Sequence, residues 1–310
     1  MAQPSYNIED VYKAIYKINN YFGEFKRNGL TFDITDGLIR KYCQYGNKSG
    51  YGNCRDYLEK ASSGVINLLT NLKDTNGLEY DKLAEYAILW LRYKLNQKSP
   101  YNSTKLNDFY TKYIEKNKYY DEKIKGNGSP TYKEIIDKKK DLMNINEMTK
   151  FSYPFSILLF LYNATNANKL DCTNYSYYAS EFATRFKGFN NDPNNIEGSS
   201  YNKILSTISN DYDNLKNKYN KKSCNFPSLP ELIPQKRPEE ISEKGSAQNI
   251  VESPVGNSGQ PTALSSEVTS SSSSISTTLI PALSIVSIIP VFLGISYKVN
   301  NKELKTIIFL

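Results

Sequence analysis

Four cysteines are the side chains whose type and spacing best suit covalent chemistry: Cys43, Cys54, Cys172 and Cys224. An even number of cysteines ahead of a long apolar segment favours two disulfides in a domain exposed to an oxidising compartment. The alternative is a set of buried free thiols. Metal binding is disfavoured, because the sequence has no Cys-x-x-Cys pair and no histidine to complete a tetrahedral site. We therefore expect disulfides, and neither a metal nor another cofactor.

Three pairings of these four cysteines are possible. A bond between Cys43 and Cys54 would close a short loop that contains three glycines, so closure would be sterically easy. Cys172 and Cys224 would then bracket the last part of the folded domain. The sequence favours this pairing by geometry but leaves the other two open.

The remaining polar residues show no arrangement typical of an active site. Without histidine the chain has no Ser-His-Asp triad, no Cys-His pair and no histidine proton shuttle. The glycine motifs that bind phosphates or dinucleotides, and the Gly-x-Ser-x-Gly turn of hydrolases, are absent too. The acidic pair Glu239-Glu240 lies in a low-complexity stretch, and Glu9-Asp10 suits a helix N-terminus. We expect a protein that is not an enzyme and has no small-molecule substrate.

The charge and the tyrosines carry little functional information. A net charge of +7, made of lysines among acidic residues, is typical of a solvated surface. The chain has no aromatic RNA-binding motif and no basic helix followed by heptads, so nucleic acid is not an expected partner. The 26 tyrosines include Tyr119-Tyr120 and Tyr177-Tyr178, which would suit a recognition surface. Asn, Lys, Tyr and Ile share A/T-rich codons, however, and most of this excess reflects genome composition.

Apolar residues recur at helical spacing through residues 1–225. The clearest stripe consists of Leu83, Ala87, Leu91 and Leu95, and it predicts an amphipathic helix from 81 to 96 whose core includes Trp90. Similar stripes predict helices near residues 11–22, 57–72, 132–148, 151–163, 178–186 and 204–219, with 155–161 as a central buried segment. Strand-like alternation is nearly absent. We expect an all-α ectodomain over residues 1–225.

Two further segments follow this domain. Residues 226–274 contain six prolines and a run of five serines with few apolar side chains, which predicts a flexible, disordered linker or stalk. Residues 275–297 are apolar and uncharged, and they are long enough to span a hydrocarbon core of about 30 Å as one helix.

The charges beside the apolar segment predict its orientation. Lys298, Lys302 and Lys305 follow it, whereas only Glu267 precedes it closely. The positive-inside rule then places residues 298–310 in the cytosol as a short tail and the N-terminal domain outside. The first residues lack the features of a cleavable signal peptide, so we expect none. A tail-anchored protein with a cytosolic domain is the rival topology, and the lysines and paired cysteines argue against it.

Several of these segments together resemble one known family. They are the helix sequence 85–96 (EYAILWLRYKLN), Lys41-Tyr42-Cys43, Asn53-Cys54, residues 180–205 and the apolar run 280–298. The combination resembles the PIR (Plasmodium interspersed repeat) variant antigens, of the YIR, BIR and CIR type found in rodent malaria parasites. The resemblance covers nearly the whole chain except the linker.

This resemblance implies a protein exported to the infected erythrocyte, at or near its surface, with a part in antigenic variation and immune evasion. It brings no catalytic residues. The implied partners are the lipid bilayer, through the C-terminal helix, and a host receptor or antibody. The alternative function is an adhesion or receptor-binding module for one host ligand. An exposed apolar or aromatic patch would favour that alternative, whereas a polar surface would favour a decoy antigen.

Two features depart from the family's pattern. Many relatives have a further cysteine near the N-terminus, and this chain has none before Cys43, so pairings cannot simply be carried over. Relatives also usually continue into a longer Arg/Lys-rich tail, from which this chain diverges at Val299. The sequence Val-Asn-Asn-Lys can be encoded by codons that begin with GT, the first bases of an intron. Residues 299–310 are therefore either an authentic tail or translated intron sequence.

Overall fold

The computed structural model describes residues 6–27, 30–35, 37–44, 54–165 and 171–236. Of residues 24–27 and 30–35 it describes the backbone only. The chain divides into two compact units, Met1–Pro238 and Glu239–Leu310, and every described residue lies in the first.

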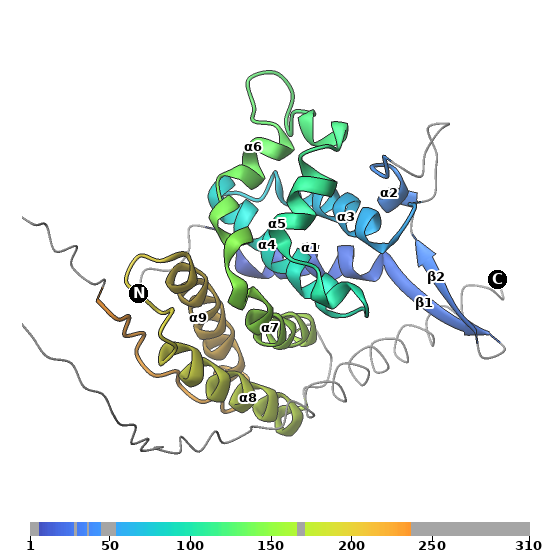
Figure 1. Ribbon diagram of the computed structural model, residues 1–310. Helices are drawn as coiled ribbons and strands as arrows, with labels where there is room; N and C mark the ends of the chain where they lie inside the picture. Colours follow the sequence, from blue (N-terminus) through green and yellow to red (C-terminus); the bar gives the residue numbers. More distant parts are fainter. Residues whose placement is uncertain (1–5, 28–29, 36, 45–53, 166–170, 237–310) are drawn as a thin grey trace, which may run out of the picture. The chain divides into compact units, whose positions relative to one another are not determined.

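The described part is mostly helical, with one hairpin, several short 3₁₀ segments and a short π-helical segment (Figure 1). The helices are α1 (Ile8–Asn20), α2 (Gly37–Arg40), α3 (Tyr57–Leu72), α4 (Tyr80–Asn96), α5 (Leu106–Phe109), α6 (Tyr132–Asp137), α7 (Ser152–Ala164), α8 (Cys172–Asn190) and α9 (Ser200–Asn220). The strands are β1 (Phe22–Arg27) and β2 (Leu30–Thr35). The short 3₁₀ segments are η1 (Tyr101–Ser103), η3 (Lys118–Asp121), η4 (Lys140–Asn144) and η5 (Asn146–Phe151), and the π-helical segment is η2 (Tyr110–Ile114).

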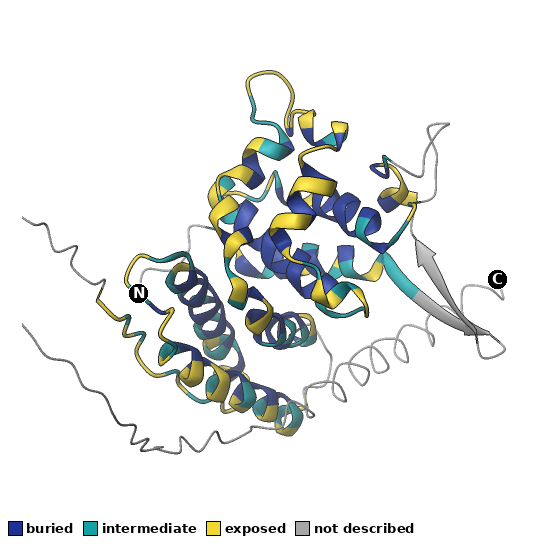
Figure 2. Ribbon diagram, viewed as in Figure 1, coloured by how far each residue is buried: buried dark blue, intermediate teal, exposed yellow. Residues whose placement is uncertain are grey.

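Helix α4 lies at the centre of the domain. Every residue from Leu83 to Leu95 is buried, and the helix packs against α3, α6 and α7 (Figure 2). This confirms the predicted helix over residues 81–96 and the core position of Trp90. On α3, Gly64 faces the Trp90 ring so closely that a Cβ atom there would overlap it. The two helices can therefore approach only because residue 64 has no side chain.

Helix α7 forms as predicted, but the region before it differs. Pro154 lies in the first turn of α7, where a missing backbone N–H is tolerated, so the proline does not break the helix. The central segment 155–161 is buried on most sides. The predicted helix over 132–148 is wrong in extent: α6 starts with a capping box between Thr131 and Glu134 and ends at Asp137. Two single helical turns, η4 and η5, carry the chain on to α7.

The β1–β2 hairpin corrects the prediction of a purely α-helical domain. The strands are antiparallel, and Phe22 pairs with Thr35 and Phe25 with Phe32 in the backbone register. In the sequence they are separated by Asn28-Gly29, a dipeptide that favours two-residue hairpins. Asn28-Gly29 could therefore have predicted the hairpin, but the helical periodicity of α1 just before it dominated the prediction.

Helices α8 and α9 form an antiparallel pair at the end of the domain, and the chain then folds back along them. Phe226 is buried against α9, and Gln235 forms a parallel bridge with Ile196 in the α8–α9 loop. Residues 226–236, which were predicted to be part of the linker, are thus bound to the domain. Any flexible linker therefore begins at least eleven residues later than predicted, because aromatic packing and backbone hydrogen bonds order this stretch.

The predicted membrane segment, residues 275–297, and the predicted tail, 298–310, lie outside the described residues. So does the linker beyond residue 236. Among the residues that the structure describes, none of the helices combines the length and apolar character needed to cross a bilayer.

Candidate functional site

The four cysteines form two disulfides in the structure. Cys43 is bonded to Cys54 and Cys172 to Cys224, with Cα atoms 5.0 Å apart in each pair. This is the pairing that the spacing favoured. The bonded sulfurs are not thiolates, and within the described ranges no three Asp, Glu or Cys side chains are grouped as metal ligands.

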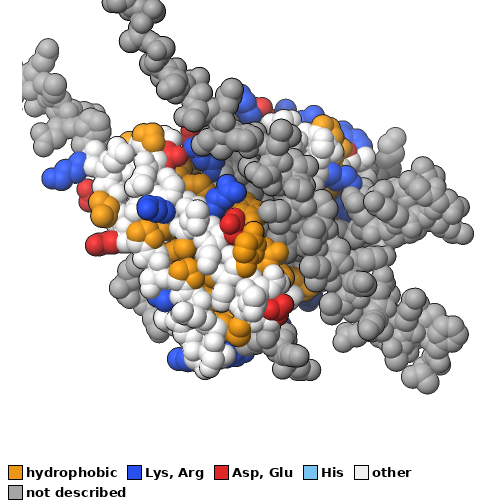
Figure 3. Space-filling model, turned by 90° about the horizontal axis from the view of Figure 1, so that it is seen from below, with side chains coloured by type: hydrophobic (Ala, Val, Ile, Leu, Met, Phe, Trp, Pro, Cys, Tyr) orange, Lys and Arg blue, Asp and Glu red, His pale blue; other side chains and the backbone are white. Residues whose placement is uncertain are grey.

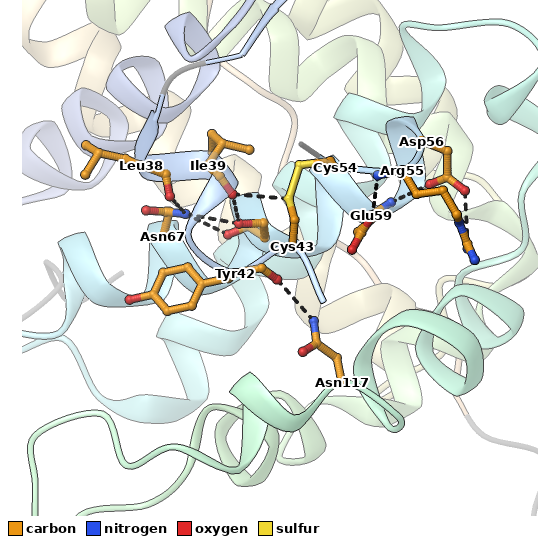
Figure 4. Close-up of a disulfide and its surroundings, with 11 residues drawn as sticks. Leu38, Ile39, Tyr42, Cys43, Cys54, Arg55, Asp56, Glu59, Asn67 and Asn117 are labelled. Atoms are coloured by element: carbon orange, nitrogen blue, oxygen red, sulfur yellow. Dashed lines mark hydrogen bonds and ion pairs between the residues drawn. A yellow bond between two sulfur atoms is a disulfide. The ribbon is translucent and has the colours of Figure 1, made fainter. Parts of the chain in front are cut away.

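The first disulfide joins the residues that follow α2 to the residues that precede α3 (Figure 4). Cys43 follows α2 and is fully buried, whereas Cys54 lies just ahead of α3. Two side chains of α3 hold α2 in place: Asn67 Nδ2 and Ser63 Oγ donate to carbonyls of α2, the former at 3.1 Å. The ends of the segment between the two cysteines are therefore fixed on α3.

The start of α3 is built around Asp56. Its carboxylate accepts from the Glu59 backbone N–H at 2.8 Å, which caps the helix, and from the Tyr113 hydroxyl at 3.1 Å. Arg55 forms an ion pair with the same carboxylate at 3.5 Å. Burial, followed by the charge of Asp56, raises the pKa of the Tyr113 hydroxyl. These contacts secure the Cys54 side of the disulfide.

A buried carboxylate lies elsewhere in the domain, on α9. Asp211 is 2% exposed and accepts from the Tyr12 hydroxyl at 2.9 Å and from the Tyr86 hydroxyl at 2.9 Å. The Tyr162 hydroxyl donates to the backbone carbonyl of Asp211 at 2.7 Å, and the Tyr6 and Tyr86 hydroxyls are 3.1 Å apart. We call these five residues the Asp211 junction; it joins α1, α4, α7 and α9.

Burial dominates the electrostatics of the Asp211 junction. Loss of solvent raises the pKa of Asp211 to about 7, and the two tyrosine hydrogen bonds and Lys82 only partly oppose this rise. Burial also raises the pKa values of Tyr12 and Tyr86 well above their usual range. The Asp211 carboxylate is buried, and its hydrogen-bond donors are tyrosines of α1 and α4. The arrangement holds helices together and does not resemble an active site.

Asp211 was not among the residues predicted from the sequence, although the sequence contains a signal for it. The apolar stripe of α9 runs through Ile204, Ile208, Tyr212 and Leu215, and residue 211 lies three residues after Ile208 and four before Leu215. A carboxylate at such a position is on the buried face of the helix. Buried carboxylates require hydrogen-bond donors, which this tyrosine-rich chain supplies from distant helices.

Two shallow clefts flank the start of α1. The larger has a volume of about 450 Å³ and is lined by Asn7 and Asp10 of the α1 region and by polar residues at the end of α3 and just after it. The smaller, of about 210 Å³, has an ion pair between Lys218 and Glu9 in its lining, with 2.6 Å between nitrogen and oxygen. Both are open and polar, and neither gathers a nucleophile beside a base.

The two tyrosine pairs noted in the sequence have unequal environments. Tyr120 is buried and donates to the Ser62 carbonyl at 2.9 Å, while Tyr119 is half-buried against Tyr42. Tyr178 is buried and packs on α7, whereas Tyr177 is 53% exposed. Of these four tyrosines, Tyr177 is the one whose side chain is largely exposed to solvent.

Comparison with known proteins decides the family. The sequence profile described as Plasmodium variant antigen protein Cir/Yir/Bir matches residues 12–298, which is most of the chain. The chain belongs to the Cir/Yir/Bir family of variant antigens. This confirms the resemblance to PIR proteins inferred from residues 85–96 and the other shared segments.

A solved structure agrees with membership of the Cir/Yir/Bir family. The ectodomain of a Plasmodium PIR protein matches the chain with 37% sequence identity and a TM-score of 0.54. The match covers 72% of this chain and 99% of that ectodomain. Among curated proteins, none matches. At the level of the Cir/Yir/Bir family, the chain is therefore a variant surface antigen, and its described domain is mostly helical with two disulfides.

Proposed function

We propose that this protein is exported to the surface of the malaria-infected red blood cell, where its ectodomain is a non-enzymatic antigen that takes part in antigenic variation and immune evasion. Membership of the variant antigen family supports the role. The two disulfides support exposure to an oxidising compartment, because thiols are kept reduced in the cytosol. The partners that we propose are the lipid bilayer and host antibodies.

The character of the described surface is the observation that carries this proposal. The large hydrophobic side chains that are clearly exposed are Leu38 on α2, Tyr177 on α8 and Ile233 after α9, which lie on separate elements. On the face seen in Figure 3, hydrophobic side chains occur in small groups separated by charged and other side chains. A dedicated host ligand would favour a larger continuous apolar patch. The described surface therefore supports an antigen in preference to an adhesion module for a single receptor.

The proposed topology is a single membrane pass. Residues 275–297 would cross the bilayer, the N-terminal domain would lie outside, and residues 298–310 would be cytoplasmic. Lys298, Lys302 and Lys305 support this orientation, since positive charge accumulates on the cytoplasmic side.

Protease treatment of intact infected red cells tests the proposal. An epitope tag inserted after Gly126 would be well placed, because this loop is exposed and Gly126 and Gly128 leave open space around them. We expect external protease to remove this tag. A second tag at the C-terminus should stay protected and serves as the matched control for membrane integrity.

Each outcome of the tag experiment is informative. Protection of both tags would overturn surface display and would place the protein in an internal membrane. Loss of the C-terminal tag with protection of the loop tag would contradict the orientation instead. Removal of the loop tag alone would support both.

A further inference from the structure

Residues 225–236, which we call the strap, are attached firmly at their first end. The Cys172–Cys224 disulfide bonds the start of α8 to the residue before the strap. Ser223, with φ of 64°, reverses the chain after α9. Phe226 is buried and stacks on Tyr219, with ring centroids 4.4 Å apart. A covalent bond and a buried aromatic ring therefore hold this end.

The other end of the strap is attached by hydrogen bonds. Asn190 Nδ2 donates to the Glu231 carbonyl at 2.6 Å, and Asn190 Oδ1 accepts from the Ile233 N–H at 3.0 Å. The Gln235 N–H donates to the Asn195 carbonyl at 2.7 Å, and the Gln235 carbonyl accepts from the Glu197 N–H at 2.8 Å. Ile233 is 66% exposed, so little apolar surface is buried here.

The strap spans the length of α9. Helix α9 has 21 residues and is therefore about 30 Å long. Three prolines, Pro227, Pro230 and Pro234, favour extended chain at about 3.1 Å per residue, so twelve strap residues cover a similar distance. Between the two ends, Tyr212 donates to the Pro227 carbonyl at 2.8 Å and Lys216 to the Ser228 hydroxyl at 2.8 Å.

This unequal attachment has a consequence for local opening. Segments with exposed hydrogen bonds and little apolar burial open at lower free energy than the packed core. At the Gln235 end the hydrogen bonds are exposed and little apolar surface is buried. At the other end Phe226 is buried and the chain is covalently bonded through Cys224. If the chain is pulled at residue 236, the hydrogen bonds of Gln235, Ile233 and Glu231 also break one after another, starting with those of Gln235.

We propose that the strap is a releasable clasp that peels from its Gln235 end and stops at the Cys172–Cys224 disulfide. This inference rests on the proposed function, because a membrane tether beyond residue 236 is what would draw on the strap. Release of residues 227–236 adds ten residues to the tether, or about 35 Å of extended chain. It also moves the exit of the chain from the α8–α9 loop to the opposite end of α9, roughly 30 Å away.

Hydrogen exchange on the full chain in detergent micelles tests the clasp. We expect the amides of Ile233, Gln235 and Glu197 to exchange together and at least tenfold faster than the amides in the middle of α9. Asn190→Ala should speed this group a further tenfold and leave α9 unchanged. Lys187→Ala is the matched control, because Lys187 is exposed on the same helix and its side chain forms no hydrogen bond or ion pair within the described ranges.

Removal of the Cys172–Cys224 disulfide, at which peeling is proposed to stop, provides the second measurement. In the double variant Cys172→Ser and Cys224→Ser, the exchange rate of the Phe226 amide should rise toward the rate measured at the Gln235 end. The proposal is overturned if the far-end amides exchange at the same rate as α9, or if Asn190→Ala accelerates α9 equally. Exchange is measured on isolated protein, so a negative exchange result would not contradict the proposed surface location. A protected loop tag in infected cells would likewise not contradict the clasp.

Discussion

The hydroxyl of Tyr12 donates a 2.9 Å hydrogen bond to the carboxylate of Asp211, 199 positions further along the chain. Tyr86 supplies a second donor from α4, and Tyr162 binds the Asp211 backbone carbonyl from α7. Four helices therefore meet at a single buried residue. Such a network stabilises the domain only while it is complete, because a buried polar group without a partner costs about 1–3 kcal/mol.

Asp211 should make the stability of the domain depend on pH. Its pKa is raised from 3.8 to about 7, so between these values the folded state keeps a proton that the unfolded state releases. The free energy of unfolding should then fall as the pH rises from about 4 to about 7, by up to about 4 kcal/mol. Denaturation at several pH values, followed by the fluorescence of the single tryptophan, measures this fall.

Asp211→Asn should remove most of this pH dependence, because the amide does not titrate. Asp108→Asn is the control, since Asp108 is exposed in α5. Burial also raises the pKa of Asp213, so a smaller slope of the same sign should remain. If the Asp211→Asn variant kept the full original slope, the pH dependence would have to originate elsewhere.

Tyr12→Phe should destabilise the domain more at pH 8 than at pH 5. The lost hydrogen bond is made to a charged acceptor only when Asp211 is ionised, and such bonds contribute about 1.5–3 kcal/mol. Tyr16→Phe on the same helix is the control, because the Tyr16 side chain makes no hydrogen bond within the described ranges. Equal losses at both pH values would indicate lost packing in place of a lost charged hydrogen bond.

Gly64→Ala should destabilise the domain although alanine is the better helix former. The added Cβ would overlap Trp90 Cη2 and would lie 3.0 Å from Phe22 Cζ. Overpacking of this kind costs about 1–3 kcal/mol. Gly188→Ala in α8 is the matched control: apart from its two neighbours and the backbone of its own helix, no atom lies within 4 Å of the new Cβ, so stability should rise by about 0.5–1 kcal/mol. Urea titrations of both variants give the comparison, and a neutral Gly64→Ala would refute the close approach of α3 and α4.

Removal of each disulfide should destabilise the domain by different amounts. The Cys172–Cys224 bond spans 52 positions and the Cys43–Cys54 bond 11 positions. The loop-entropy relation then gives losses of about 4 and about 3 kcal/mol for the two Cys→Ser pairs. Urea titrations of both double variants measure them. The reverse order would mean that native contacts around Cys43 contribute more than chain entropy.

Periodicity within single segments accounts for the parts of the fold that were predicted. The stripe from Leu83 to Leu95 identifies α4, because side chains three and four residues apart share one helix face. The pairing of Cys43 with Cys54 was favoured because the loop that it closes contains three glycines, which makes closure sterically easy. The hairpin was missed because β1 (FGEFKR) has no regular alternation, because β2 (LTFDIT) alternates over only six residues, and because both follow a strong helical stripe.

The sequence by itself determined the helical class, the main helices and the resemblance to the family, and it favoured one cysteine pairing while leaving two others open. These depend on patterns within a few turns of chain or on shared segments. Tertiary structure decided that Asp211 is buried among tyrosines and that residues 226–236 bind α8 and α9. Both outcomes depend on donors and aromatic faces contributed by other parts of the fold. No periodicity encodes such contacts, because each partner is specified only once the helices have packed.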